Sequence, residues 1–585
     1  MFSPMKPSSR RLKTKTLWLM ALIGLVIFFI VQIFPTTASD TLQMEQSDDV
    51  IAKSQARTKA IEFAKSVLNI ELAGHPEKAL VTYESRSDLY GYLTKADLLA
   101  PFLKTYDKQF PYDVFRVRFN EPNDVFSALT VDVHMTTGKV VGFEEIVSSS
   151  NAKKQMMLDY GTETPDSLRT WEGDLTLEEK ERLAAPYLAA FGFDPARLER
   201  VSGEGDVGLL YHIKGDELGE SQATIDIRYE YGAVSSFESY FSVPESHADY
   251  VAGQTRLANW LTFAGYALFT FVLGILAIVY SALTRAHTTF KRGIFLAGAY
   301  FVLSVIGTVN MLPVFEKDGL DPIVLTVGFV IQGLVTLILA ASVYFSLVGG
   351  DGLWRKNGIN LWARSREEGY GRHVLTAVAD GYAWALILLG VQSVVFFILE
   401  RTIHTWSTTD ATQSPYNMVY PLLFPLLAWV AGIGEEAVYR LFGIPMLKKL
   451  FRSTFIASLL TTLIWAFGHT LYPIYPVISR PIELTFIGLL FSFIFLRYGF
   501  PTVVFSHVIF DSILMALSLM FMGGAVNIAA GLVYIALPAI VAYVIYLFNP
   551  PGKERQGPPQ GPPPLHPLQP QQPEPPQSPQ LLQQP

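Results

Sequence analysis

Residues 416–440, YNMVYPLLFPLLAWVAGIGEEAVYR, join an apolar run to a cluster of ionisable side chains. The run at 416–433 carries no charge and is close to the length that a helix needs to cross a bilayer. Glu435, Glu436 and Arg440 follow it directly. Because ionisable groups are costly within apolar helices, this stretch predicts a membrane helix that ends in a functional cluster.

The remainder of the chain also indicates a membrane protein. Of its 585 residues, 50% are hydrophobic and only 17% are charged, which is unusual for a soluble protein of this length. Further apolar runs lie at 260–282, 293–312, 323–348, 374–399, 454–471, 484–496, 502–520 and 528–547. We therefore predict a mainly α polytopic bundle of transmembrane helices, with helices at 256–400 and a C-terminal domain at 416–547.

Both ends of the chain differ in composition from the apolar runs. Residues 1–16 are basic, and the apolar run within 17–35 is longer than the core of a typical signal peptide. We therefore expect a signal-anchor helix at 17–35. A cleavable signal that ends near Ala38 is the alternative. Residues 549–585 are rich in Pro and Gln and should remain disordered.

A polar insert at 36–255 contains an internal repeat. Residues 130–133, TVDV, recur as TIDI at 224–227, and a Gly-containing turn follows at the same spacing in both copies. Apolar and polar residues alternate around each turn, as in a β-hairpin. Helical periodicity precedes each hairpin, at 56–68 and at 177–191. We predict two α+β modules, at about 50–150 and 175–245, which resemble PepSY-like domains.

Basic residues between the apolar runs give an orientation. Three loops carry clusters of Lys and Arg, and alternate crossings from a cytoplasmic N-terminus place all three in the cytoplasm, as the positive-inside rule requires. The clusters are Arg285, Lys291 and Arg292; Arg355, Lys356, Arg364, Arg366 and Arg372; and Lys448, Lys449 and Arg452. We therefore expect a multi-pass cell-membrane protein whose termini are cytoplasmic and whose residues 36–255 are extracytoplasmic.

Composition also limits the chemistry. The chain has no cysteine, which excludes disulfides, thiolate metal sites and a cysteine nucleophile. The net charge of -7 argues against nucleic acid as a partner. The expected partners are membrane lipids and a membrane-protein or peptide substrate, and the oligomeric state stays open.

Three groups of polar residues interrupt the last apolar runs. Glu436 and Arg440 are one helical turn apart and can pair, whereas Glu435 points elsewhere. His469 follows an aromatic residue at a spacing of four, and His507 and Asp511 share a helix face. Glu435, His469, His507 and Asp511 could converge to activate water, to stabilise an oxyanion or to hold a divalent metal such as zinc.

In order and spacing, these three motifs resemble those of the CAAX protease and bacteriocin-processing (CPBP, or Abi) family of intramembrane endopeptidases. The resemblance covers roughly residues 416–547. It implies that Glu435 and His507 activate the attacking water and that His469 and Asp511 stabilise the oxyanion. Glu436 and Arg440 would then support the site structurally, and no organic cofactor is implied.

The chain departs from the family pattern at two positions. Asp511 stands where eukaryotic members carry Asn, so this acid must be protonated, orient a histidine or bind a metal. Trp465 replaces the usual Phe, which on sequence grounds is a mild change.

The sequence favours an enzyme, a CAAX-protease-like peptide hydrolase, over two other classes. One alternative is a non-catalytic membrane scaffold or a bacteriocin-immunity protein that retains the bundle. The other is a sensor or proton-coupled transporter that uses the buried acids as a relay. The chain shows no His-Glu-x-x-His signature and no convincing Gly-x-Ser-x-Gly signature, which weakens other hydrolase interpretations.

Overall fold

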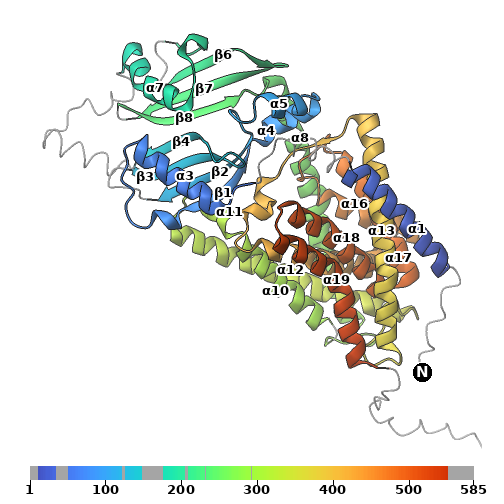
Figure 1. The fold of residues 1–585 in the computed structure, drawn as a ribbon. Coiled ribbons are helices and arrows are strands. Elements are labelled where there is room, and N and C mark those ends of the chain that lie inside the picture. The colour runs from blue at the N-terminus through green and yellow to red at the C-terminus, as the bar shows by residue number, and fades with distance from the viewer. Residues whose placement is uncertain are drawn as a thin grey trace, which may run out of the picture.

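The computed structural model describes residues 11–34, 50–120, 126–147, 175–203, 208–230, 232–291 and 293–550. A helical bundle and an antiparallel sheet lie side by side in these residues (Figure 1). The predicted fold class, a helical transmembrane bundle with an α+β insert, is confirmed. Most of the basic N-terminus (1–10) and of the Pro- and Gln-rich tail (551–585) lie outside the described residues.

The insert forms one sheet across both repeats. Within the described residues it has eight strands in the order β1-β2-β3-β4-β8-β7-β6-β5, and all neighbours are antiparallel. The first four strands are β1 (Leu80–Ser85), β2 (Asp113–Asn120), β3 (Phe126–His134) and β4 (Val140–Val147). The second four are β5 (Leu198–Arg200), β6 (Leu209–Leu218), β7 (Ser221–Glu230) and β8 (Ala233–Phe241).

The two repeats meet at matching residues. Phe143 and Phe237 occupy the same position in the two copies, and they are Cα partners where β4 pairs with β8. Because that pair is antiparallel, the two halves are related by a local two-fold arrangement. The hairpins β3–β4 and β7–β8 are those that the repeated TVDV and TIDI segments predicted.

Helices of both repeats cover the sheet and build its core. Helix α3 (Lys53–Ser66) and helix α7 (Leu177–Phe191) contribute Phe63 and Phe191, whose ring centroids lie 5.6 Å apart. Phe191 also stacks on Phe237 of β8 at 4.3 Å. Both helices therefore pack on one apolar face of the continuous sheet. The shorter helices α4 (Ser87–Lys95) and α5 (Leu99–Thr105) follow β1.

Long apolar helices make up the bundle. Eight helices in the described residues are long and apolar enough to cross a membrane, and two shorter apolar helices accompany them. The eight are Thr14–Ile33 (with α1), Glu245–Leu283 (α8, a π-helical segment and α9), Pro322–Lys356 (α12), Tyr370–Ile403 (α13), Pro421–Phe451 (with α14 and α15), Ser479–Tyr498 (α17), Phe500–Phe521 (α18) and Ala525–Phe548 (α19). The shorter two are α10 (Ile294–Asn310) and α16 (Thr454–Phe467), and α11 (Leu312–Glu316) follows α10.

The N-terminal helix belongs to this bundle. Helix α1 (Thr14–Phe28) packs on α13, where Gly24 and Gly390 allow the two backbones to approach closely, as small residues do between membrane helices. The Arg11 side chain donates to the carbonyl of Arg497 at the end of α17. The first apolar run is thereby fixed against the C-terminal helices.

The sheet is joined to the bundle through β1. The Asn417 side chain accepts from the Tyr83 amide and donates to the Tyr83 carbonyl, both at 2.7 Å, and so imitates a neighbouring strand. Ser85 and Thr409 are hydrogen-bonded at 2.6 Å, and Lys317 pairs with Glu84 at 3.1 Å. The loop that leads to Glu435 is therefore held by the edge strand of the sheet.

Candidate active site

Glu435 lies within a long helical segment rather than at a helix end. The sequence predicted that the apolar helix would stop near 433, but helical structure begins at Pro421 and continues to Phe451. It runs from a 3-10 segment (Pro421–Leu426) through α14 (Leu427–Glu435) and a π-helical segment (Glu436–Gly443) to α15 (Ile444–Phe451). The predicted end is wrong because packing against neighbouring helices buries the charged turn. The π-helical segment starts directly after Glu435, and such segments are frequent at functional sites.

Glu436 and Arg440 form the predicted ion pair. Their side chains are fully buried, and Arg440 Nη1 donates to Glu436 Oε1 at 2.9 Å. The Arg440 guanidinium lies 4.6 Å from the ring centroid of Trp465 and 5.3 Å from that of Phe491. A buried cation needs such compensation, so this pair and its aromatic neighbours fix the helix in register.

Glu436 has a second contact that the sequence did not predict. Its Oε1 lies 2.8 Å from Nδ1 of His507, which projects from α18, and the His507 ring stacks on Phe491 at 4.5 Å. A carboxylate paired with arginine is an acceptor, so Nδ1 of His507 carries the proton. Nε2 of His507 then faces the opposite way, 3.7 Å from Glu435 Oε2 and 3.5 Å from Asp511 Oδ2. Glu436 thus orients His507, as well as neutralising Arg440.

His469 reaches Glu435 from the other side. It lies just beyond the end of α16, where its Nδ1 is 3.0 Å from the carbonyl oxygen of Trp465. A carbonyl only accepts, so Nδ1 is the protonated nitrogen. Nε2 faces Glu435 Oε1 at 3.9 Å, and the ring is stacked with Tyr472 at 5.8 Å. His469 can therefore donate from Nε2 only as an imidazolium.

The indole of Trp465 contacts the candidate catalytic carboxylate directly. Its Nε1–H donates to Glu435 Oε2, from a position one helical turn before His469. The difference between Trp465 and the usual Phe is therefore larger than the sequence suggests, because Phe has no donor to offer. The spacing of four residues to His469 was the signal in the sequence, since residues i and i+4 share a helix face.

The four predicted residues therefore come together. Glu435 is central, with an Nε2 atom on each side and the Trp465 N–H on its carboxylate, and Asp511 lies beyond His507. Such a cluster can hold a water molecule and transfer protons from it. Within the described chain, no group of three or more His, Asp and Glu side chains has the arrangement of a metal site. As placed, the residues do not fit a metal ion, so zinc stays a sequence prediction and no step is assigned to it.

Comparison with known proteins identifies the same region. Residues 417–513 match the family model described as type II CAAX prenyl endopeptidase Rce1-like, and this range includes all four predicted site residues. The sporulation-killing factor biosynthesis protein SkfC of Bacillus subtilis (strain 168) is 22% identical over 521 residues, which are 86% of this chain and 94% of that protein. No solved structure matches. The family resemblance inferred from the three motifs is thereby confirmed.

Proposed function

We propose that this chain is an intramembrane endopeptidase that hydrolyses peptide bonds of membrane-associated proteins or peptides. The match to the Rce1-like family indicates a protease-type function for the C-terminal helices. The observation that carries the finer proposal is the position of Glu435, whose carboxylate oxygens lie 3.9 Å and 3.7 Å from the Nε2 atoms of His469 and His507.

In this proposal Glu435 and His507 activate the water. The 3.7 Å between Glu435 Oε2 and His507 Nε2 is short enough for one water molecule to contact both atoms. Glu435 accepts the proton as the water oxygen attacks the scissile carbonyl carbon. The Trp465 N–H holds the carboxylate in place, and Glu436 holds the His507 ring, so neither group needs to reorient during the reaction.

In the same proposal His469 stabilises the oxyanion, whereas Asp511, for which the family resemblance implies the same role, acts on His507. Because Nδ1–H of His469 is engaged by the Trp465 carbonyl, Nε2 of the neutral ring is an acceptor, and it donates to the oxyanion only after it has taken up a proton. Asp511 lies beside His507 Nε2 and stabilises the positive charge that His507 gains when Glu435 passes it the proton taken from the water. The proton is then available for the amine that leaves.

Orientation in the membrane belongs to the proposal too. The segment at 311–321 and the loop at 404–420 contact the sheet, and the loop at 468–478 contacts Gln254 on α8, which directly follows the sheet. If α10 and α16 are counted as crossings, each of these three segments follows an odd-numbered crossing. With a cytoplasmic N-terminus, these segments and the sheet lie outside the cytoplasm.

The sheet would then present a substrate to the site or restrain it. SkfC is named for the biosynthesis of a killing factor, so a precursor of such a factor is the first substrate to test.

The test compares membrane-protein fragments in cells that express the intact chain and in cells that express Glu435→Gln. We expect a defined set of fragments that disappears in Glu435→Gln and in His507→Ala. The matched control is Glu400→Gln, which makes the same change at an exposed position at the end of α13. Expression and thermal stability of each variant are measured in parallel.

Identical fragment patterns in all the variants, with folding preserved, would refute the protease proposal. They would favour a scaffold or immunity protein. Proton flux into liposomes without any cleaved product would favour the transporter alternative.

A further inference from the structure

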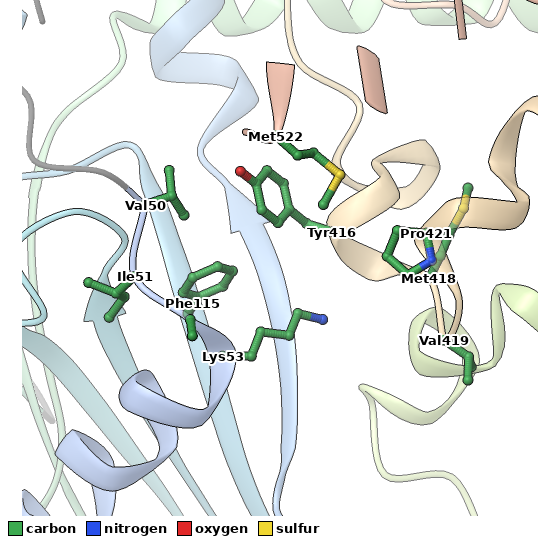
Figure 2. A pocket seen from close by; sticks show the side chains of 10 residues that line it. Val50, Ile51, Lys53, Phe115, Tyr416, Met418, Val419, Pro421 and Met522 are labelled. Carbon is green, nitrogen blue, oxygen red and sulfur yellow. The ribbon is translucent and has the colours of Figure 1, made fainter. Parts of the chain in front are cut away.

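A cavity of about 340 Å³ lies at the junction of the sheet and the bundle, and we call it the seam pocket. Figure 2 shows residues from both sides of this junction lining it. The residues on the sheet side are Val50, Ile51, Ala52, Lys53 and Phe115, and those on the bundle side are Tyr416, Met418, Val419, Pro421 and Met522. No step proposed above uses the seam pocket.

Lys53 is the only charged residue among those that line the seam pocket, and most of the others are apolar. Figure 2 shows the Lys53 side chain extended toward the bundle side, among Phe115, Tyr416 and Met418. Burial, with a further contribution from the charge of Arg57, lowers the pKa of Lys53 to about 8, so the ammonium is still mostly charged at neutral pH. In the described residues no carboxylate pairs with Lys53. A partly buried cation without a counter-charge is an attractive position for an anion.

The backbone around Lys53 adds to this positive potential. Lys53 is the first residue of α3, where the helix dipole favours anions and disfavours cations. A lysine at this position costs stability unless something compensates for it. A bound anionic group beside the ammonium would provide that compensation.

Exposed apolar residues lie in or near the segments that line the seam pocket on the bundle side. Pro421 begins the helical segment that carries Glu435, and Met522 directly follows α18, just before the last crossing helix. Val419 of the lining is 42% exposed, its neighbour Tyr420 is 64% exposed, and Val526 at the start of α19 is 67% exposed. Tyrosine at this level is typical of the membrane–water interface. A molecule with an apolar chain can therefore enter sideways from the bilayer.

We propose that the seam pocket binds one anionic phospholipid, with its phosphate beside Lys53 and an acyl chain against Met418, Val419 and Met522. This inference goes beyond the proposed function and does not rest on it. The lipid would connect α3 of the sheet domain to Pro421, the first residue of the catalytic helical segment. It would thereby stabilise the same junction that Asn417 and Tyr83 hold together.

The experiment uses the purified full-length protein in a zwitterionic detergent. Phosphatidylglycerol and phosphatidylcholine with identical acyl chains are titrated separately, and the midpoint of thermal unfolding is followed by tryptophan fluorescence. We expect phosphatidylglycerol to raise the midpoint more than phosphatidylcholine does. Lys53→Gln should weaken the apparent affinity for phosphatidylglycerol roughly tenfold, the effect of losing one charge-assisted contact. Lys65→Gln, the same change at an exposed position of α3, should leave it unaltered.

Further measurements distinguish a bound phospholipid from other anionic ligands. Inorganic phosphate at the same concentration should give no shift, since it lacks the apolar contacts. Lys53→Arg should retain the preference for phosphatidylglycerol, and Val419→Asp should abolish it by placing a second anion in the lining. The proposal is overturned if Lys53→Gln and Lys65→Gln respond alike, if phosphate reproduces the shift, or if an acidic peptide stabilises the protein and the lipid does not.

Discussion

Glu435 and Glu436 are adjacent in the sequence, but their surroundings assign them different tasks. The Oε1 atom of Glu436 contacts both Arg440 and Nδ1 of His507, within 2.9 Å, so this carboxylate is engaged in structural contacts. Glu435 faces two Nε2 atoms at longer distances, which leaves space for a water molecule. One helical step of about 100° separates the two environments. At the residue scale, therefore, the site contains one carboxylate that can contact water, Glu435, and a second that holds its neighbours in place, Glu436.

Trp465→Phe tests how Glu435 is positioned. The change removes the indole N–H that donates to Glu435 and keeps an aromatic ring near Arg440. We expect formation of the Glu435-dependent fragments to slow about tenfold, because a hydrogen bond to a charged group contributes roughly 1.5–3 kcal/mol. Thermal stability measured in parallel should change little. An unchanged rate would mean that the two histidines suffice to position the carboxylate.

At the scale of elements, the loop before the catalytic helical segment acts as a partner strand for β1. Asn417→Ala would leave the amide and the carbonyl of Tyr83 without their buried partner. We expect a loss of about 1–3 kcal/mol at the junction, the usual cost of unsatisfied buried groups. Hydrogen exchange at the amides of β1 should accelerate. Gln413→Ala, at an exposed position of the same loop, is the control and should leave this exchange unchanged.

The middle of the sheet contains an acid whose burial makes stability depend on pH. Burial, with repulsion from Glu230 as the smaller cause, raises the pKa of Glu145 on β4 to about 7. Because the folded state holds this proton more tightly than the unfolded state does, stability is lost as the pH rises from about 4.5 to 7. Glu145→Gln should therefore unfold at a higher temperature than the natural chain at pH 8.

The size of that effect should be on the order of 1–2 kcal/mol, since solvent reduces the electrostatic cost of a partly exposed group. Near pH 4 the Glu145→Gln variant and the natural chain should unfold alike. Glu144→Gln, the adjacent exposed position of β4, serves as the control. A difference between Glu145→Gln and the natural chain that is equal at both pH values would contradict a titrating Glu145.

At the scale of the whole molecule, the sheet and the basic loops lie at opposite ends of the bundle, so the topology is directly testable. The chain contains no cysteine, which makes single-cysteine labelling unambiguous. Thr137→Cys, in the exposed β3–β4 turn, should react with a membrane-impermeant maleimide in intact cells. Ser365→Cys, in the basic segment between α12 and α13, should react only after permeabilisation. The reverse result would invert the proposed orientation.

Features of the fold and of the candidate site could be predicted from the sequence where they depend on local spacing. The apolar runs near 20 residues predicted the bundle, because the thickness of a bilayer fixes the length of a spanning helix. The spacing of His507 and Asp511 predicted their shared helix face, since helical geometry is local. The repeated TVDV and TIDI segments predicted two hairpins for the same reason. Each of these properties depends on neighbours in the sequence alone.

The other features of the fold and the site depend on long-range contacts. The sequence could not show that Glu436 orients His507, that the Trp465 N–H meets Glu435, or that Phe143 and Phe237 join the two repeats in one sheet. The sequence also predicted an end for the helix of Glu435 that is too early. A charged turn has the composition of a helix end, but in the structure packing buries it within the helix. Such contacts join residues that are distant in the sequence, and the packing of whole helices and strands determines them, whereas local periodicity does not.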